Sequence, residues 1–325
     1  MARFKVVITD SPFPSPEPFF ETLREAEAEV VLAENPEDRA ALAALCAEAD
    51  AVIVTYAQID AELIGAMEKN RLLARTGVAV NNIDLAAATA KGIFVTNVVT
   101  AQVPDVANHA IALLLTVAKK IVLLNNLVKG GLWSLAPADP VYKLDGRVLG
   151  LAGFGNIPRA VARRARGFDL KVMAHDPYVS AEAMAEHGVE KVDFDGLIRE
   201  SDYLSIHLPL TGDTRNIFGR AEFRAMKNTA LLINTARGGV IDEPALVEAL
   251  KSGEIAGAGL DVLSTEFPGQ DHPLYKFDNV VITPHSAYLS VECVRDLQRS
   301  AALEVLRVLK GEKPVSVVNR ELLSS

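Results

Sequence analysis

The stretch VLGLAGFGNIPRA, residues 148–160, decides the fold that we predict for this chain. It begins with an apolar run typical of a buried strand, passes through Gly153 and Gly155, and continues in a pattern typical of a helix. In a dinucleotide site the first glycine permits a tight turn, and the second lets a pyrophosphate approach the backbone. Pro158 replaces the third glycine of the usual pattern. Proline is acceptable in a first helical turn, because the N–H that it lacks would have no partner there.

A second, independent signal for a dinucleotide lies 21 residues beyond Gly155. The strand-like run KVMAHD ends at Asp176, whose carboxylate can accept hydrogen bonds from an adenosine ribose and repel a 2′-phosphate. The amides of Asn156 and Ile157, at a helix N-terminus, favour a bound phosphate. The pattern therefore predicts NAD in preference to NADP. The alternative is a glycine-rich turn in an ordinary α/β protein, which leaves the spacing of Asp176 unexplained.

The same alternation of strand and helix patterns runs along the whole chain. Near-continuous apolar strands between helices are typical of a parallel sheet buried on both faces. The 325 residues exceed one average core, and two such series of elements predict two doubly wound domains. A long helix over about 104–129 precedes the second series, and a last helix over about 289–310 is expected to return to the first domain.

Composition limits the classes of partner. The formal net charge is −9 and no basic patch is evident, which argues against nucleic acid or an anionic membrane as a partner. The most apolar stretch, residues 110–128, is interrupted by Lys119 and Lys120, so we expect a buried helix there. The cysteines, Cys46 and Cys293, are far apart in sequence, which suits a reducing cytoplasm. We find no signal-peptide pattern and no metal-ligand spacing.

Three later strand ends carry residues suited to the chemistry of a 2-oxo acid. Arg237 can anchor a carboxylate by two parallel bonds and polarise a carbonyl. His285 can exchange a proton near neutral pH, and a neighbouring Glu266 would orient its ring and favour imidazolium. Each residue alone has an ordinary explanation, respectively a surface ion pair, a loop carboxylate and a capping residue. Their order and their shared place at strand ends favour a functional site.

These motifs together resemble a known family. GFGNIP, HDPY, SIHLPLTGDT, INTARGGVID, GAGLDV and TPHSA occur here in the order that the D-2-hydroxyacid dehydrogenase family shows. The similarity covers nearly the whole chain and is closest to the branch that contains the C-terminal-binding-protein corepressors and their bacterial relatives.

The resemblance implies roles for individual residues. Arg237, Glu266 and His285 would be catalytic, with the backbone around Gly77, Val78 and Ala79 holding the substrate carboxylate. Tyr56 is either a wall of the substrate pocket or an ordinary packing residue. The residues expected to contact the cofactor are Gly153, Gly155, Asn156, Ile157, Asp176, His207, Pro209, Thr214, Thr235, Ala236, Arg237, Asp261, His285 and Ala287.

The resemblance also implies the architecture and the activity. A flavodoxin-like substrate domain (1–99 and 287–325) would carry an inserted Rossmann NAD-binding domain (100–286), and the helix at 104–129 would form the arm of a homodimer. The expected activity is NAD-dependent interconversion of a small 2-oxo acid and its D-2-hydroxy acid. The alternative is a protein that senses NAD(H) and acts through partners, with little turnover.

The chain departs from the family pattern near the substrate. Ala79 stands where the family has a second glycine, Asn81 replaces an aspartate, and Val103 replaces a threonine. Because these positions lie outside the catalytic set, we expect them to alter the substrate pocket.

Overall fold

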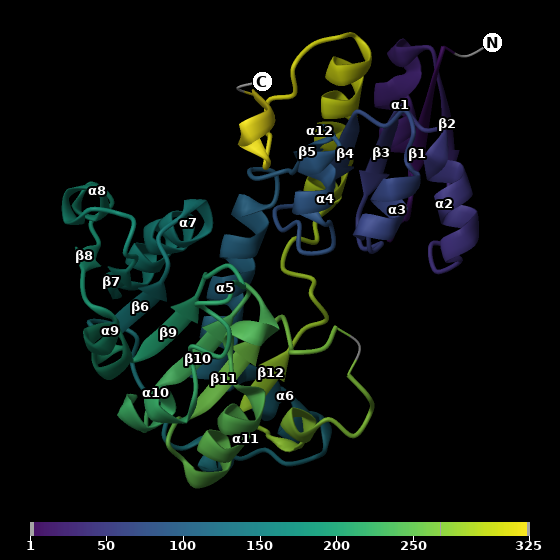
Figure 1. Ribbon diagram of the computed structural model, residues 1–325. Coiled ribbons are helices and arrows are strands. Elements are labelled where there is room, and N and C mark those ends of the chain that lie inside the picture. The colour runs from purple at the N-terminus through teal and green to yellow at the C-terminus, as the bar shows by residue number, and fades with distance from the viewer. Residues whose placement is uncertain (1–2, 267, 324–325) are drawn as a thin grey trace. The chain divides into compact units, whose positions relative to one another are not determined.

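The computed structural model describes residues 3–266 and 268–323. The chain divides into two compact units (Figure 1). Unit 1 comprises Met1–Gln102 with Ser290–Ser325, and unit 2 comprises Val103–Leu289. The domain boundaries expected from the sequence lie three residues from these divisions.

Unit 1 is a five-stranded parallel sheet in the order β2-β1-β3-β4-β5, the flavodoxin-like order. Aspartates start three of its helices, because the side chains of Asp38, Asp60 and Asp84 each accept a hydrogen bond from a first-turn amide. Its elements are β1 (Phe4–Ile8), α1 (Glu17–Leu23), β2 (Ala28–Leu32), α2 (Arg39–Ala47), β3 (Ala51–Val54), α3 (Ala61–Ala66), β4 (Leu72–Arg75), α4 (Leu85–Ala90), β5 (Phe94–Thr96) and α12 (Val291–Leu309).

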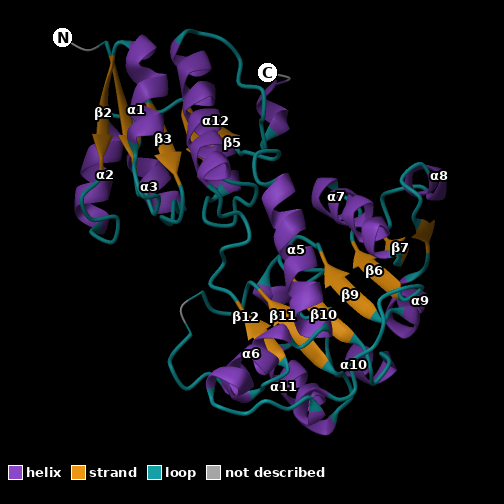
Figure 2. Cartoon of the chain, turned by 180° about the vertical axis from the view of Figure 1, so that it is seen from behind, coloured by secondary structure: helices purple, strands orange, loops and turns teal. Residues whose placement is uncertain are grey.

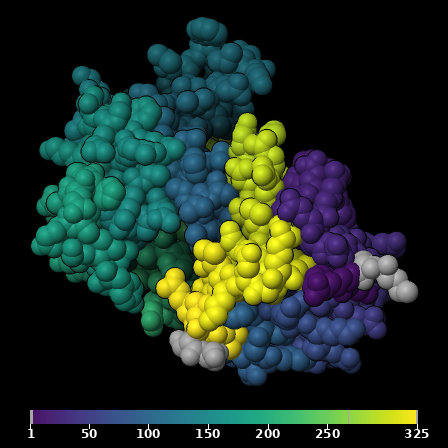
Figure 3. All heavy atoms as spheres, turned by 90° about the horizontal axis from the view of Figure 1, so that it is seen from above, coloured from purple at the N-terminus to yellow at the C-terminus, as the bar shows by residue number. Residues whose placement is uncertain are grey.

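Helices cover both faces of this sheet. Alternate strand residues such as Val52 and Leu73 pack with α2, α3 and α4 in one apolar cluster. On the other side α12 packs against β3, β4 and α1. The side chain of Gln298 on α12 donates a hydrogen bond to the carbonyl of Ser15, next to α1. Figure 3 shows this C-terminal segment in yellow beside the purple N-terminal residues. The last helix therefore packs as part of the first unit.

Unit 2 is a seven-stranded sheet in the order β12-β11-β10-β9-β6-β7-β8, with every pair parallel. The chain moves outward from β6 to β8 and then returns to the other side of β6 with β9, so the strand order reverses between β6 and β9. Its elements are α5 (Val103–Ala118), α6 (Ile121–Lys129), β6 (Val148–Ala152), α7 (Asn156–Ala165), β7 (Lys171–His175), α8 (Ala181–Ala185), β8 (Glu190–Lys191), α9 (Phe194–Glu200), β9 (Tyr203–Ile206), α10 (Arg220–Ala225), β10 (Leu231–Asn234), α11 (Glu243–Ser252), β11 (Gly257–Leu260) and β12 (Val280–Ile282).

Two apolar clusters hold the layers of unit 2 together. Leu151 and Ile233 face α5 and α7, whereas Ile206 and Leu232 face α9, α10 and α11 (Figure 2). The helix α5 lies close to β11 because Gly259 has no side chain. A Cβ at this position would stand 3.0 Å from the Cβ of Leu113. Both faces of the sheet are thus buried, which agrees with the apolar strand sequences.

The expected single helix over 104–129 is wrong. The chain forms α5 and α6, which are bent by 59° at a break around Lys119 and Lys120, where Lys120 has a left-handed φ of 50°. The physical reason is burial: α5 buries seven residues, whereas α6 buries none. Among the described residues no single helix is long and apolar enough to cross a membrane, although α5 and α6 together satisfy the length and composition criteria as a bent pair.

Candidate active site

The glycine turn after β6 lies at the point where the strand order reverses. Gly153 has φ of 95°, and a Cβ there would stand 2.9 Å from the carbonyl oxygen of His207. Its amide donates to the carbonyl of His175 at the end of β7. Three strand ends therefore meet at a residue that must be glycine. Ligands of open α/β sheets bind at such a reversal, beyond the carboxyl ends of the strands.

The helix α7 begins at Asn156, and Gly155 is its N-cap residue. Pro158 is buried within the first turn and does not interrupt the helix. The first amides of α7, those of Asn156 and Ile157, face the turn with no helical acceptor, which is the arrangement that binds a phosphate. The replacement of the third glycine therefore leaves the turn and the helix N-terminus intact.

Asp176 follows β7 and is fixed against the glycine turn. Its carboxylate accepts hydrogen bonds from the amide of Phe154 at 2.8 Å and from the amide of Tyr178 at 2.9 Å. The carboxylate is thereby held beside the turn at the same sheet edge, where a ribose bound at the turn would meet it.

The loops after β9 and β10 supply further groups at this edge. The ring of His207 shares a hydrogen bond with Ser205 at 2.9 Å, and burial lowers its pKa to about 3, so it is neutral. The Thr214 hydroxyl closes its loop by donating to the carbonyl of Pro209. The Thr235 hydroxyl oxygen is buried and has no hydrogen-bond partner among the described residues. A bound polar group would satisfy it, so this loop fits a cofactor.

Arg237 lies on a turn that the buried Asn234 holds in shape. The Asn234 side chain accepts from the amide of Ala236 and donates to the carbonyl of Arg237. The guanidinium donates to the carbonyl of Ala236. Sequence reasoning missed Asn234, although an asparagine ending a buried strand is a typical turn signal.

His285 and Glu266 form a direct pair. Nδ1 of His285 lies 2.9 Å from each carboxylate oxygen of Glu266. The hydrogen bond from His285 is the main cause that lowers the pKa of Glu266, and the charge of Arg237 lowers it further. Because a carboxylate only accepts, Nδ1 carries hydrogen and Nε2 is left to exchange a proton. The structure thus brings together the three side chains that the sequence selected.

Asp261 makes contacts that the sequence did not predict. The sequence predicts that Asp261 lines the cofactor. In the structure its carboxylate is buried and accepts hydrogen bonds from the amides of Ser286 and Ala287 at 2.9 and 3.0 Å. Its carbonyl accepts the amide of His285 at 2.8 Å. The carboxylate therefore shapes the loop that carries His285.

In unit 1 the expected substrate loop follows β4. The amide of Gly77 already donates to the carbonyl of Arg75, whereas those of Val78 and Ala79 donate to no described residue. Only these two amides are therefore available to a carboxylate, a narrower set than the sequence implies. The Arg75 guanidinium lies across Gly77, since a Cβ there would fall 1.5 Å from its Nη1 atom. Arg75 is a charged neighbour of this loop that the sequence analysis missed.

Asp10, after β1, organises the loop that carries Tyr56. Its carboxylate accepts the amides of Thr55, Tyr56 and Ala57, the second at 2.6 Å. Tyr56 itself is 45% exposed. Three hydrogen bonds to backbone amides therefore fix the loop that carries Tyr56.

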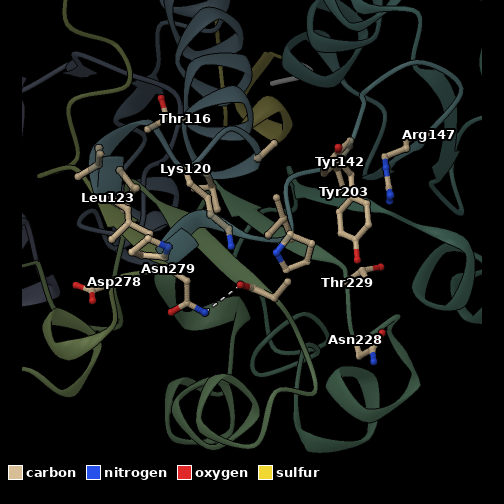
Figure 4. A pocket seen from close by; sticks show the side chains of 18 of the residues that line it. Thr116, Lys120, Leu123, Tyr142, Arg147, Tyr203, Asn228, Thr229, Asp278 and Asn279 are labelled. Carbon is tan, nitrogen blue, oxygen red and sulfur yellow. Dashed lines mark hydrogen bonds between the residues drawn. The ribbon is translucent and has the colours of Figure 1, made fainter. Parts of the chain in front are cut away.

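A cavity of about 500 Å³ lies elsewhere in unit 2, at the amino ends of the strands (Figure 4). Residues at the starts of β9, β10 and β12 line it together with α6, among them Tyr203, Leu231 and Val281. It is therefore distinct from the edge that carries the glycine turn, which lies beyond the carboxyl ends.

The chain is similar to known proteins of one family. Residues 111–287 match the model of the D-isomer specific 2-hydroxyacid dehydrogenase, NAD binding domain. A glyoxylate reductase of Thermococcus litoralis is 40% identical over 285 residues, 86% of each chain. A D-3-phosphoglycerate dehydrogenase of Archaeoglobus fulgidus is 39% identical over 82% of this chain and 51% of its own length. A solved glyoxylate reductase from Paecilomyes thermophila is 28% identical, with TM-score 0.87 over 99% of this chain and 100% of that one.

The chain belongs to the D-2-hydroxyacid dehydrogenase family. Within that family it is an NAD-dependent oxidoreductase of 2-hydroxy acids.

Proposed function

We propose that the chain reduces a small 2-oxo acid to its D-2-hydroxy acid with NADH. The observation that carries the proposal is the pairing of His285 with Glu266 in the field of Arg237. An acid, a group that orients it and a guanidinium are the side chains that protonation of a 2-oxo group requires.

The ring of His285 acts as the proton donor. Glu266 holds Nδ1, so Nε2 of the protonated ring gives its proton to the oxygen on C2 of the acid. An NADH bound at the carboxyl edge of the unit 2 sheet would supply the hydride to C2. In the reverse direction neutral His285 takes the hydroxyl proton. Arg237 polarises the carbonyl and binds the carboxylate, so it acts on both the binding and the chemical step.

Unit 1 is proposed to recognise the substrate carboxylate. The unpaired amides of Val78 and Ala79 offer two donors, and the nearby guanidinium of Arg75 adds positive charge. The methyl group of Ala79 and the ring of Tyr56 would limit the size of the group carried on C2.

The carboxyl edge of the unit 2 sheet is proposed to hold NAD. The amides of Asn156 and Ile157 would bind the pyrophosphate, and Asp176 the adenosine ribose. The remaining expected contacts come from the turns after β9, β10, β11 and β12, and the unpaired hydroxyl of Thr235 supports their placement.

Steady-state assays with NADH and a panel of 2-oxo acids test the proposal. The panel starts with glyoxylate, because relatives named glyoxylate reductase are among the most similar chains, and includes pyruvate and hydroxypyruvate. Saturable NADH oxidation with at least one acid, giving the D product, is the expected result. Tight NADH binding without turnover of any acid would instead favour the NAD(H)-sensing alternative.

We further propose a homodimer, with the arm placed on α6 and the segment after it rather than on α5. No residue of α6 is buried, and Trp133 and Leu135 in the segment after it are 90% and 81% exposed. An isologous contact would cover this apolar surface. Sedimentation should give a dimer for the wild type and a monomer for Trp133→Glu/Leu135→Glu. Tyr178→Glu, which changes an aromatic that is 94% exposed, is the control and should remain a dimer. A wild-type monomer at micromolar concentration would contradict the proposal.

The two cysteines, Cys46 and Cys293, are buried, and burial raises the pKa of the Cys46 thiol to about 11. Inert reduced thiols support the proposed cytoplasmic location.

A further inference from the structure

The loop that carries His285 has a backbone conformation that its surroundings must maintain. His285 has φ of 51°, in the left-handed region that residues with a Cβ seldom adopt. Asp261 maintains this conformation through both its main chain and its side chain. The Asp261 carbonyl accepts the amide of His285, and the carboxylate accepts those of Ser286 and Ala287. Three successive amides thus depend on one buried aspartate.

A chain of hydrogen bonds fixes that aspartate in turn. The Thr283 hydroxyl donates to the Asp261 carboxylate at 2.6 Å, and Nε2 of His109 lies 2.9 Å from the same hydroxyl oxygen. A hydroxyl has one hydrogen, and the Thr283 hydroxyl already donates it to the carboxylate. Nε2 of His109 must therefore carry the hydrogen of the second bond and donate it to Thr283.

His109 also lies close to the carboxylate of Asp261. The Asp261 side chain is fully buried, and Nε2 of His109 lies 3.5 Å from its Oδ1 atom. A buried carboxylate needs its lone pairs satisfied by donors, and here the donors are two amides and the Thr283 hydroxyl, which His109 holds in place. His109 comes from α5, so a helix on the face of the sheet reaches the loop of the catalytic histidine.

We propose that His109 and Thr283 are positioning residues for His285. They act through Asp261, whose carboxylate they orient so that the loop presents the imidazole ring toward Glu266. The inference rests on the proposed function, in which His285 transfers the proton. Neither residue is required to touch the substrate or the cofactor.

Matched substitutions separate positioning from simple packing. Thr283→Val removes the hydroxyl and keeps the shape, whereas Thr283→Ser keeps the hydroxyl. His109→Phe removes the donor and keeps the ring, whereas His109→Gln retains an amide N–H at a similar reach. His285→Ala is measured beside them, and circular dichroism with NADH fluorescence titration reports folding and cofactor binding.

Single-turnover reduction at saturating NADH and glyoxylate is the first readout. Since misplacement of a reacting group by about 1 Å can cost about a hundredfold, we expect Thr283→Val and His109→Phe to slow reduction by about tenfold to a hundredfold. NADH binding should be unchanged, and Thr283→Ser and His109→Gln should react at nearly the wild-type rate. The double variant Thr283→Val/His109→Phe should be no slower than the slower of the two single variants, because both residues act in the same chain of hydrogen bonds.

The second readout is the ¹³C-histidine NMR signal of His285, assigned by its loss in His285→Ala. It should shift in Thr283→Val and His109→Phe but not in the two conservative variants. Equal behaviour of the valine and serine variants, or wild-type rates and signals in all four, would overturn the inference. Retained turnover in His285→Ala would instead overturn the proposed function, and the NMR signals would then decide the inference alone.

Discussion

The carboxyl edges of the two sheets present different chemistry. In unit 2 that edge carries ionisable side chains that interact with one another, namely Arg237, Glu266 and His285. In unit 1 the corresponding edge presents two backbone amides, at Val78 and Ala79, that donate to no described residue, on a loop shaped by hydrogen bonds. Side-chain chemistry is lost outright on substitution, whereas a backbone site changes by small steps in shape. We therefore expect substitutions in unit 2 to affect turnover and substitutions in unit 1 to affect substrate choice.

The largest effect should come from His285. His285→Ala removes the positioned acid and should lower kcat for reduction by about 10²–10⁴-fold. NADH binding should remain nearly intact, because the glycine turn and Asp176 are unchanged. Stopped-flow hydride transfer and a fluorescence titration measure the two quantities. Unchanged turnover in His285→Ala would show that the carboxyl edge of unit 2 does not supply the proton, and the expected difference between the two edges would fail.

The next effect concerns cofactor choice. Asp176→Ala removes the ribose acceptor and the charge that repels a 2′-phosphate. A hydrogen bond to a charged group contributes about 1.5–3 kcal/mol, so preference for NADH over NADPH should fall by about tenfold to a hundredfold. Asp176→Asn is the control, because its one carbonyl oxygen keeps an acceptor for one of the two amides, which bond to different oxygens of Asp176, but it loses the charge. A wild type that already prefers NADPH would refute the role of Asp176.

The Glu266–His285 pair predicts a pH dependence. The hydrogen bond from His285 lowers the pKa of Glu266 below its ordinary 4.5, so the carboxylate is ionised throughout the neutral range. The interaction is thus present above pH 4.5 and is lost as pH falls through the lowered pKa. Glu266→Gln removes this titrating partner of His285, so the variant should reduce the acid more slowly at neutral pH and should lack the fall in rate that acid causes in the wild type. A pH–rate profile that coincides with that of the wild type would contradict the pairing.

The desolvated ring of His207 makes unit 2 sensitive to acid. Its pKa of about 3 in the folded chain lies below the ordinary 6.5, so unfolding takes up a proton between these pH values. Stability should fall as pH drops below 6.5, by at most about 1.4 kcal/mol per pH unit from this group. Hydrogen exchange measured by mass spectrometry at several pH values reports the stability of each unit. His207→Asn should reduce the dependence of stability on pH in unit 2 peptides and leave that of unit 1 peptides unchanged. An equal change in both units would mean that they open together.

Local patterns made much of unit 2 predictable. The turn at Gly153, the helix start at Asn156 and the strand ends before Asp176 and Arg237 follow from residue types at fixed spacings. Features that depend on how distant segments pack did not follow. The break at Lys120 reflects burial of α5 without α6, and the use of the Gly77 amide within its own turn leaves no trace in the sequence. The bonds from Asp10 to the Tyr56 loop join residues 45–47 positions apart, a separation that no periodicity reports.

The smallest effect should come from Ala79, and it tests whether unit 1 sets substrate size. Ala79→Gly removes one methyl group beside the two free amides. Since a methylene contributes about 0.8 kcal/mol, kcat/KM for a 2-oxo acid with a branched substituent should rise by about fourfold relative to glyoxylate. The change should appear in KM, because Ala79 contributes no side chain to proton transfer. Ala90→Gly alters an exposed alanine at the end of α4 and is the control for general effects on unit 1. A change in kcat that is equal for all acids would show that the loop of unit 1 takes part in the chemical step, and the division of labour between the two edges would then fail.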